Sequence, residues 1–437
     1  MQYAAVGEYL DKLQGENSKL SLDNVQLIIA NLPFTVGSVK YIQVAGTNGK
    51  GSTSHFIAAI LRSAGWRVGL FTSPHLQDVR ERVILNGRII SRRDFAVAIS
   101  AVDDICQELL RRQVIVNQPT FFETVFLAAL FHFSKSQADW AVLEVGLGGR
   151  LDATSTVIPE VAVITNIAKD HTQILGTTLA AIAREKAGIC KENVPLVSGC
   201  PHGSIAGHVI GRVARAKKAP FHEAFAPSCG LRIEKIGRSY LCHYRSGSRQ
   251  YNYRVYLKGR HQTVNAAVAV KTIDVLKGLG WNIADPAISR GIKNMFIPAR
   301  IESLGGRPPL ILDGGHNPDG IRVLVDFLRE ENINAFTLIF GVLGDKHYPA
   351  MARQLAPLAA NVILTAPLCE RALAPEKLLP FFKKANCRIE MNFSKALAIA
   401  KKFKRIIIVC GSLYLAGAMR TVVCGGKKYG RQKVNGN

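Results

Sequence analysis

The sequence lacks any hydrophobic run long enough to cross a membrane. A membrane-spanning helix needs roughly 18 or more predominantly apolar residues, and the longest candidate, 125–133, is interrupted by His132. The first residues carry Glu8 and Asp11 and lack the basic-then-apolar order of a signal peptide. We therefore expect a cytoplasmic protein with no membrane partner.

Paired cysteines are also missing. The nine cysteines stand at irregular spacing, and no two form a C-x-x-C pair. Several of them, such as Cys410, lie inside apolar strings. An odd number of cysteines without close pairs argues against a disulfide framework and against a thiolate metal centre. The pattern favours free thiols in a reducing compartment.

Acidic residues are scarce relative to basic ones. The chain has 32 Asp and Glu residues against 56 Lys and Arg residues, a formal net charge of +24. Clustered positive charge attracts the phosphates of nucleic acid. Here the surplus is spread along the whole chain, although 401–405 and 427–433 are dense, and no nucleic-acid-binding motif accompanies it. We expect a generally basic surface or small anionic substrates, and no nucleic-acid partner.

What is present is an ordinary globular composition with alternating strands and helices. The 437 residues, 48% of them hydrophobic, suggest two or three domains. The Asn86-Gly87 pair predicts a hairpin within 83–90, and Ser91 followed by Asp94 predicts a helix start. Alternating strands and helices indicate an α/β fold with a largely parallel sheet. The expected strands are 38–46, 68–71, 140–145 and 161–165, and the expected helices are 3–13, 21–31, 55–64, 91–112 and 120–134.

The pattern changes in the second half of the chain. Short alternating strands over 220–257 precede a helix over 261–280, and Pro298 with 303–309 marks a linker. The alternation then restarts, which predicts domains at 1–298 and 299–437, with a flexible tail from about 421. The expected strands of the second domain are 309–313, 336–340, 361–365 and 405–410, and its helices are 318–330, 375–386 and 394–403.

A glycine-rich turn joins the strand at 38–46 to the following helix. Glycines let backbone N–H groups approach a phosphate, and the helix N-terminus adds its positive dipole. Lys50 can reach the terminal phosphates, and Ser52 or Thr53 can meet Mg²⁺. Val44 stands where the first glycine of the usual phosphate-loop pattern would be. A turn without a ligand is the alternative. The predicted phosphate-binding residues are Thr47, Asn48, Gly49, Lys50, Gly51 and Ser52.

Further chemistry-bearing residues follow the predicted strands. Glu144 lies in an apolar string, where a carboxylate is costly unless it is paired or bound to a cation. The segment 72–76 and the pair Asp170-His171 end neighbouring strings, and ligands bind at the carboxyl ends of such strands. Oxygen ligands suit Mg²⁺. Spacing alone favours a turn histidine for His171 and a solvated surface charge for Lys186.

The second domain carries its own candidate residues. Asp313 ends a strand, and a Gly-Gly turn then presents His316. The carboxylate can accept hydrogen bonds from a ribose or base, and the imidazole can face an anion. Arg300 can reach a phosphate with two parallel hydrogen bonds, although an interdomain salt bridge fits it equally well.

Eight strings, taken together, resemble the folylpolyglutamate synthase/dihydrofolate synthase family of the ATP-dependent Mur ligase superfamily. They run in order over 40–417, nearly the whole chain, and bacterial members of this family are often bifunctional. The strings are GTNGKGS, TSPHL with the ERV at 81–83, PTFFE, EVGLGGRLDAT, TNIAKDH, EKAGI, DGGHNP and GSLYLAG.

The resemblance implies a P-loop ATPase-type N-terminal domain and a smaller Rossmann-like C-terminal domain. In these terms 1–298 is an ATP-binding Mur-ligase-type central domain and 299–437 a glutamate-ligase domain. The resemblance also implies ATP and two Mg²⁺ ions, with the second ion near a carbamylated Lys186. The implied residues are Ser73, Glu144 and His171 for the metal, Lys50, Lys186 and His316 for catalysis, Asn265, Arg300 and Asp313 beside the phosphate loop for the nucleotide, and Arg82, Thr120, Phe121, Phe122, Asp152, Ser412 and Tyr414 for substrates.

The implied reaction joins L-glutamate to dihydropteroate, to reduced folates, or to both, through an acyl phosphate. No side-chain nucleophile is required, and a monomer is expected. Two positions depart from the family pattern: 297–300 reads Ile-Pro-Ala-Arg where the family has Pro-Gly-Arg, and His347 replaces an Asp. The alternatives are a Mur-type ligase acting on peptidoglycan precursors and, less favoured, a basic nucleotide-responsive nucleic-acid binder.

Overall fold

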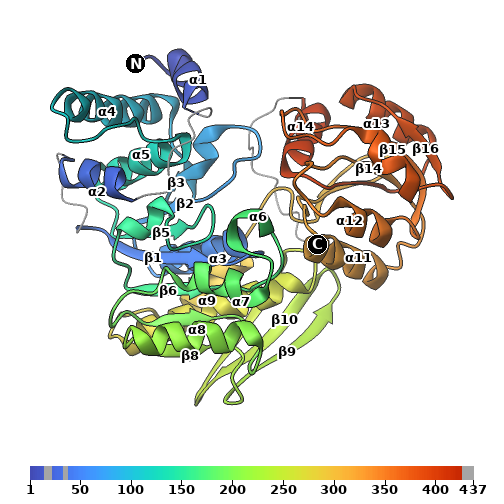
Figure 1. Cartoon of the computed structure of the whole chain (residues 1–437). Helices are drawn as coiled ribbons and strands as arrows, with labels where there is room; N and C mark the ends of the chain where they lie inside the picture. The colour runs from blue at the N-terminus through green and yellow to red at the C-terminus, as the bar shows by residue number, and fades with distance from the viewer. Residues whose placement is uncertain (14–21, 33–37, 426–437) are drawn as a thin grey trace. The chain divides into compact units, whose positions relative to one another are not determined.

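The computed structural model describes residues 1–13, 22–32 and 38–425. Two compact units divide the chain, the first over Met1–Phe296 and the second from Ile297 onward (Figure 1). Both are α/β units, as the sequence predicts. The first is built on a mostly parallel sheet of eight strands and the second on a sheet of six.

The large sheet of the first unit has the order β4-β3-β2-β5-β1-β6-β7-β8. Strands β2, β5, β1, β6, β7 and β8 pair in parallel, while β3 and β4 form the antiparallel hairpin that Asn86-Gly87 predicts. The strands are β1 (Lys40–Ala45), β2 (Val68–Phe71), β3 (Val83–Leu85), β4 (Arg88–Ile89), β5 (Trp140–Glu144), β6 (Val161–Ile164), β7 (Leu196–Ser198) and β8 (Phe221–Glu223).

Local capping signals determine where several helices of this unit begin. Ser91 Oγ accepts the Asp94 N–H at 3.0 Å at the start of α4, as predicted. Helix α3 begins at Lys50, earlier than the predicted start at residue 55. The helices are α1 (Tyr3–Lys12), α2 (Asp23–Ala30), α3 (Lys50–Ser63), α4 (Arg92–Arg111), α5 (Phe121–Lys135), α6 (Thr172–Leu175), α7 (Leu179–Ala187), α8 (Ile205–Ala216), α9 (His261–Gly278) and α10 (Asp285–Lys293), with the 3₁₀ turns η2 (Val79–Arg82) and η3 (Ala153–Thr156).

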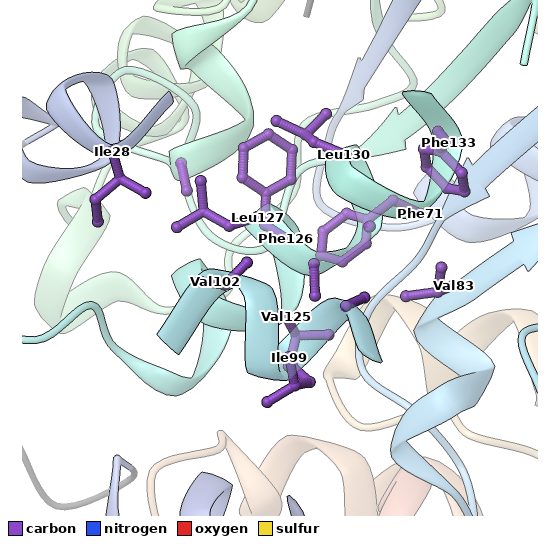
Figure 2. Close-up of a cluster of buried hydrophobic side chains, with 14 of the residues drawn as sticks. Ile28, Phe71, Val83, Ile99, Val102, Val125, Phe126, Leu127, Leu130 and Phe133 are labelled. Carbon is purple, nitrogen blue, oxygen red and sulfur yellow. The ribbon is translucent and has the colours of Figure 1, made fainter. Parts of the chain in front are cut away.

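Figure 2 shows the core where α4 and α5 pack on this sheet. Val102 of α4 and Phe126 of α5 belong to the same cluster as Phe71 of β2, and the ring centroids of Phe71 and Phe126 lie 5.5 Å apart. A second cluster joins Ala45 and Ile164 to α7 and α8. Tyr41 of the first cluster and Ala45 of the second are four positions apart on β1. Side chains an even number of positions apart on a strand point to the same face, so both clusters cover the same face of the sheet.

The region predicted as alternating short strands forms a separate three-stranded antiparallel sheet, β11-β10-β9. Alternate residues of β10, such as Tyr240 and Tyr244, are buried, while Arg245 is exposed. This is the period-2 pattern of a sheet with one covered face. Its strands are β9 (Cys229–Ile236), β10 (Ser239–Ser246) and β11 (Arg249–Val255).

The second unit has the sheet order β12-β13-β17-β14-β15-β16, in which only β12 is antiparallel to its neighbour. Helices cover both faces: one core includes residues of α11 and α12, and another those of α13 and α14. The elements are β12 (Glu302–Leu304), β13 (Leu310–Leu312), α11 (Pro318–Glu330), β14 (Phe336–Phe340), α12 (Tyr348–Leu355), β15 (Ala359–Leu364), β16 (Asn386–Ile389), α13 (Phe393–Lys402), β17 (Ile407–Cys410) and α14 (Leu413–Cys424).

Two predictions for this unit are wrong. The predicted helix over 375–386 is a 3₁₀ turn, η4 (Pro375–Phe381), followed by strand β16. Pro380 lies inside the turn, where it cannot donate the hydrogen bond that an α-helix needs. The tail does not begin near 421, because α14 continues to Cys424 and ends at Gly425, whose φ is 60°. The remaining tail lies outside the described residues.

Two expectations about composition can also be compared with the structure. All nine cysteines are free thiols, as predicted. Among the described residues no helix combines the length and apolar character needed to cross a bilayer.

Candidate active site

The glycine-rich turn connects β1 to α3 and is fixed by the loop that follows β6. Thr47 Oγ1 donates to the Ala168 carbonyl at 3.1 Å, and the Asn48 N–H donates to Asn166 Oδ1 at 2.8 Å. Gly49 has a φ of 80°, and a Cβ added there would overlap Asn265 Oδ1. The turn is thereby held in one conformation at the N-terminus of α3, where a helix favours anions.

Lys50 begins α3, and its side chain folds back over the turn. Its Nζ donates to the carbonyls of Gly46 and Thr47 at 3.1 and 3.2 Å. Ser52 and Thr53 are buried in the first turns of the helix. Within the described part of the chain Thr53 Oγ1 is a buried oxygen with no hydrogen-bond partner.

Glu144, the last residue of β5, lies between the start of α3 and the turn after β2. It is buried, and its Oε2 accepts the Ser73 N–H at 3.0 Å. A Cβ added at Gly51 would lie 3.3 Å from the same oxygen. The structure therefore brings together Glu144, Ser73 and Gly51, which come from three separate strings of the sequence.

His171 lies in the loop after β6 in a left-handed conformation, with φ 49°. Its N–H donates to Asp170 Oδ1 at 2.9 Å, and its Nε2 lies 3.9 Å from the same oxygen. Among the described residues no group of three or more His, Cys, Asp or Glu side chains is arranged to hold a metal ion. A metal ion held by the predicted set of Ser73, Glu144 and His171 would therefore need further oxygen ligands other than His, Cys, Asp or Glu side chains.

Lys186 is buried in α7, so the spacing-based interpretation of a solvated surface charge is wrong. Burial, together with the positive charge of Lys50, lowers the pKa of its ammonium from 10.5 to about 7, although the carboxylates of Asp170 and Asp152 oppose the shift. The structure thus brings Lys186 close enough to Lys50 for the two charges to interact, although the two residues are far apart in the sequence.

Asp152 closes the turn that follows β5. Its Oδ2 accepts the N–H groups of Gly146 and Leu147 at 2.9 and 3.0 Å, and its Oδ1 accepts that of Thr154 at 3.0 Å. Burial raises the pKa of this carboxyl group despite those hydrogen bonds. A Cβ added at Gly146 would meet the ring of Phe122 at 2.6 Å, so the glycine allows that ring to lie against the turn.

Two of the predicted substrate residues, Arg82 and Phe121, are in contact. The Arg82 guanidinium lies 5.0 Å from the centre of the Phe121 ring, and its Nε donates to His75 Nδ1 at 3.0 Å. Burial lowers the pKa of His75 to about 4, which leaves the ring neutral and able to accept that hydrogen bond.

Thr120 caps α5, the helix that presents Phe121 and Phe122. Its Oγ1 accepts the Glu123 N–H at 3.4 Å, and Glu123 Oε2 accepts the Thr120 N–H at 2.8 Å, which completes a capping box.

Thr120→Ala should lower the free energy of unfolding of the first unit by about 1 kcal/mol, because it removes the cap. Thr120→Ser keeps the hydroxyl and should stay within about 0.5 kcal/mol of the parent. Urea unfolding of the three proteins measures the difference. Equal losses for the two variants would contradict the capping role.

In the second unit Asp313 and His316 lie at the carboxyl end of β13. Asp313 is buried, and its two oxygens accept the N–H groups of Ile301 and Gly315 at 3.0 and 2.8 Å. Burial raises the pKa of Asp313, while the nearby Arg300 charge opposes the shift. His316 Nδ1 lies 3.0 Å from the Gly314 carbonyl.

Ser412 and Tyr414 follow β17, which pairs with β13 in parallel. Ser412 Oγ accepts the Tyr414 N–H at 3.1 Å, and the Gly411 N–H donates to the Gly315 carbonyl at 3.0 Å. The Tyr414 side chain is exposed. The predicted residues of this unit therefore gather at one end of its sheet.

Some residues of the site were missed from the sequence. Asn166 and Thr165, whose Oγ1 donates to the Asn48 carbonyl at 2.7 Å, hold the phosphate loop. Buried Glu81 accepts the N–H groups of Leu76 and Gln77 after β2. Asn166 lies in the string TNIAKDH and Glu81 in the ERV at 81–83, so their membership of these strings could have pointed to them as site residues.

Comparison with known proteins gives the family. The Mur ligase middle domain matches residues 44–273, more than half of the chain, and the Mur ligase, glutamate ligase domain, matches 299–413. The chain is 34% identical to a folylpolyglutamate synthase of Lacticaseibacillus casei, over 89% of this chain and 91% of that protein. It is 33% identical to a probable bifunctional folylpolyglutamate synthase/dihydropteroate synthase of Haloferax volcanii, over 96% of this chain and 50% of the relative.

The chain therefore spans about half the length of the Haloferax relative. Two solved structures are similar throughout. Escherichia coli FolC in complex with DHPP and ADP has a TM-score of 0.85 at 28% identity and is covered over 98% of both chains. A bifunctional folylpolyglutamate synthase/dihydrofolate synthase of Yersinia pestis, complexed with AMPPNP and Mn ion, has a TM-score of 0.84 at 29% identity, over 97% of this chain and 98% of that one.

Both parts of the chain are matched by Mur ligase families, and its relatives align at this identity over most of its length. The chain thus belongs to the Mur ligases, in the family of folylpolyglutamate and dihydrofolate synthases.

Proposed function

We propose that this protein is an ATP-dependent ligase that joins L-glutamate to 7,8-dihydropteroate and to reduced folates. The observation that carries the proposal is the edge of the first unit's sheet, where the buried carboxylate of Glu144 lies beside Gly51 of the phosphate loop and the charge of Lys50 acts on buried Lys186. The solved relatives from Escherichia coli and Yersinia pestis hold ADP with DHPP, and AMPPNP with Mn ion, respectively. A phosphate loop beside a buried carboxylate is suited to the nucleotide and the metal ion that those relatives hold.

Features of the first unit fit a nucleotide with a divalent metal. In the first turn of α3, Thr53 Oγ1 is a buried oxygen with no hydrogen-bond partner among the described residues. Glu144 offers a buried carboxylate beside Gly51 of the same turn, and oxygen ligands of this kind suit Mg²⁺. Thr47 to Ser52 would hold the phosphates, Ser73, Glu144 and His171 the metal, and Asn265 would contact the nucleotide beside Gly49. When bound, the nucleotide supplies the phosphoryl group that activates the acceptor carboxylate, and the metal neutralises charge.

The chain's own residues bind and orient rather than react. Lys50 Nζ now donates to two carbonyls of its own turn, and the same ammonium can turn toward phosphate oxygens. Asp152 fixes the turn against which the Phe122 ring lies. The surface formed by this ring and the turn is therefore already in place before a pterin ring stacks on it. Arg82, held over Phe121 by its hydrogen bond to His75, is a proposed glutamate contact of the first unit. The residues proposed for substrate in the second unit are His316, Ser412 and Tyr414.

Lys186 is the proposed site of a carbamate near a second metal ion. With its pKa at about 7, much of the amine is neutral near neutral pH, and the neutral amine is the form that adds carbon dioxide. The product is an anionic oxygen ligand in place of a cation. This would also remove the repulsion between Lys186 and Lys50.

We further propose that 1–298 is the ATP-binding domain and 299–437 the glutamate-ligase domain, a division supported by the two family matches. The free thiols suit a cytoplasmic protein. That the protein is a monomer stays a prediction, which size-exclusion chromatography with light scattering can test.

The test is ADP release by the purified protein with Mg-ATP and L-glutamate, with dihydropteroate or tetrahydrofolate as the acceptor. Glutamate-dependent turnover is expected with both acceptors, and Lys50→Met should reduce it by about a hundredfold or more. Turnover with one acceptor alone would restrict the proposal to that activity. A folded protein that is inactive with both, but active on uridine-nucleotide peptide precursors, would replace the proposal with the peptidoglycan alternative.

A further inference from the structure

Arg300 stands between two residues with an unusual backbone. Ala299 has φ 53° and Ile301 has φ 48°, both in the left-handed region. Residues with a Cβ avoid that region, and a β-branched residue such as isoleucine avoids it most strongly. Such a backbone persists only where its surroundings hold it. The turn 299–301 therefore has to be held in place by contacts from elsewhere in the second unit.

Two buried carboxylates provide these contacts. Glu302 Oε2 accepts the Ala299 N–H at 2.9 Å, and Asp313 Oδ2 accepts the Ile301 N–H at 3.0 Å. The Gly314 N–H donates to the Ala299 carbonyl at 2.8 Å. Each left-handed residue is thus tied by its own N–H to a different carboxylate, with Arg300 between them.

Glu302 is in turn held by Arg420 of α14. Arg420 Nε lies 3.1 and 3.2 Å from the two carboxylate oxygens of Glu302, and the exposed fractions of the two side chains are 9% and 2%. A carboxylate this deeply buried is costly unless a partner compensates its charge. Ser412 caps the start of the same helix, so α14 links the turn 299–301 to the candidate substrate residues.

The held turn determines where the Arg300 guanidinium lies. A Cβ added at Gly314 would be 3.2 Å from Arg300 Nη1, which places the guanidinium over the Gly-Gly turn after β13. If Ala299 and Ile301 relaxed to ordinary backbone angles, the direction of the Arg300 side chain would change. Neither Glu302 nor Arg420 has been placed among the ligand contacts.

We propose that Glu302, held by Arg420, is a positioning residue: it fixes the turn 299–301 and thereby holds the Arg300 guanidinium over the Gly-Gly turn after β13, in the position from which it would contact a nucleotide. This inference rests on the proposed function, because it takes Arg300 as the nucleotide contact that the family resemblance implies. It adds to that function two residues that act through the backbone rather than by contact.

A double-mutant cycle on nucleotide affinity tests the inference. The probe is a non-hydrolysable ATP analogue with Mg²⁺, titrated calorimetrically into the full-length protein. Glu302→Gln puts an amide NH₂ group against the Arg420 guanidinium, so it should weaken binding about tenfold, and Arg300→Ala should do the same or more. The double variant should bind no more weakly than Arg300→Ala, because Glu302 acts through Arg300. Glu376→Gln, which removes an exposed charge of the same unit, should leave the affinity unchanged.

Ala299→Gly distinguishes a positioning role of Glu302 from a general effect on stability, because only the positioning role predicts that the nucleotide affinity recovers. Glycine adopts the left-handed backbone without cost, so adding Ala299→Gly to Glu302→Gln should restore about fivefold of the lost affinity. If Glu302→Gln fails to fold, Arg420→Lys keeps the charge and should weaken binding about threefold, again with no effect in the Arg300→Ala background.

Additive losses in the cycle would overturn the inference, as would a folded Glu302→Gln protein with parental affinity. In both cases the proposed function would survive, since the parent still binds the analogue. A folded parent that binds no nucleotide would overturn the proposed function and, with it, the assigned role of Arg300.

Discussion

Replacing Lys186 with methionine should reduce glutamate ligation by about a thousandfold and at the same time stabilise the first unit. The two effects have one cause. The amine is buried and lies in the field of the Lys50 charge, and its pKa is about 7 instead of 10.5. A positive charge on this amine therefore lowers the stability of the folded protein. A thioether of similar length removes that cost, and it also removes the group that can become a carbamate.

The stability effect has a defined pH dependence. Because the folded pKa lies below the unfolded value, the cost of the buried ammonium is fully present below pH 7 and disappears as the pH rises from about 7 to 10.5. We expect Lys186→Met to be more stable than the parent by roughly 2–4 kcal/mol at pH 6, with the gap closing by pH 10. Urea unfolding at pH 6, 8 and 10 measures it.

Lys293→Met is the matched control, since Lys293 is an exposed lysine on α10 of the same unit. It should change neither the activity nor the pH dependence of unfolding. A constant stability difference between Lys186→Met and the parent across the pH range would contradict this expectation, because it would show that folding does not lower the pKa of Lys186. Activity of the parent that falls in carbon-dioxide-free buffer and returns with bicarbonate would support the carbamate.

The burial of Lys186 shows where sequence reasoning fails. Its neighbours in the chain, Glu185 and Gly188, give no sign of it, because the charges that act on it belong to Lys50, Asp170 and Asp152. Glu302 and Arg420, 118 positions apart, were missed for the same reason. Burial and long-range pairing depend on the tertiary fold, which spacing within one segment does not encode.

Features that depend on a few adjacent residues were predicted well. The hairpin at Asn86-Gly87 and the helix cap at Ser91 follow from local turn and capping chemistry. The convergence of Glu144 with the phosphate loop could be anticipated because parallel strands end at one edge of a sheet. The wrong helix over 375–386 shows the limit: the segment forms the 3₁₀ turn η4, and strand β16 begins at Asn386, where the predicted helix was to end. The pairing of β16 with β15 is not visible in the segment itself.

Gly49→Ala should weaken binding of an ATP analogue by about a hundredfold, the second large effect that the structure predicts. Gly49 has φ 80°, and an added Cβ would both strain the backbone and overlap Asn265 Oδ1. The methyl group therefore displaces the turn whose N–H groups would hold the phosphates. Calorimetric titration with the Mg²⁺ complex of the analogue measures the loss.

Gly203→Ala separates the two causes. Gly203 has a similar φ of 72°, but nothing lies within 4 Å of a Cβ added there. Both variants should lose about 1 kcal/mol of stability from the left-handed backbone, while Gly203→Ala should bind the analogue within about twofold of the parent. If both variants bound like the parent, the turn after β1 would not hold phosphates, and the site would have to lie elsewhere. If only Gly49→Ala failed to bind while its stability matched that of Gly203→Ala, the loss would come from the shape of the loop and its contact with Asn265 rather than from unfolding.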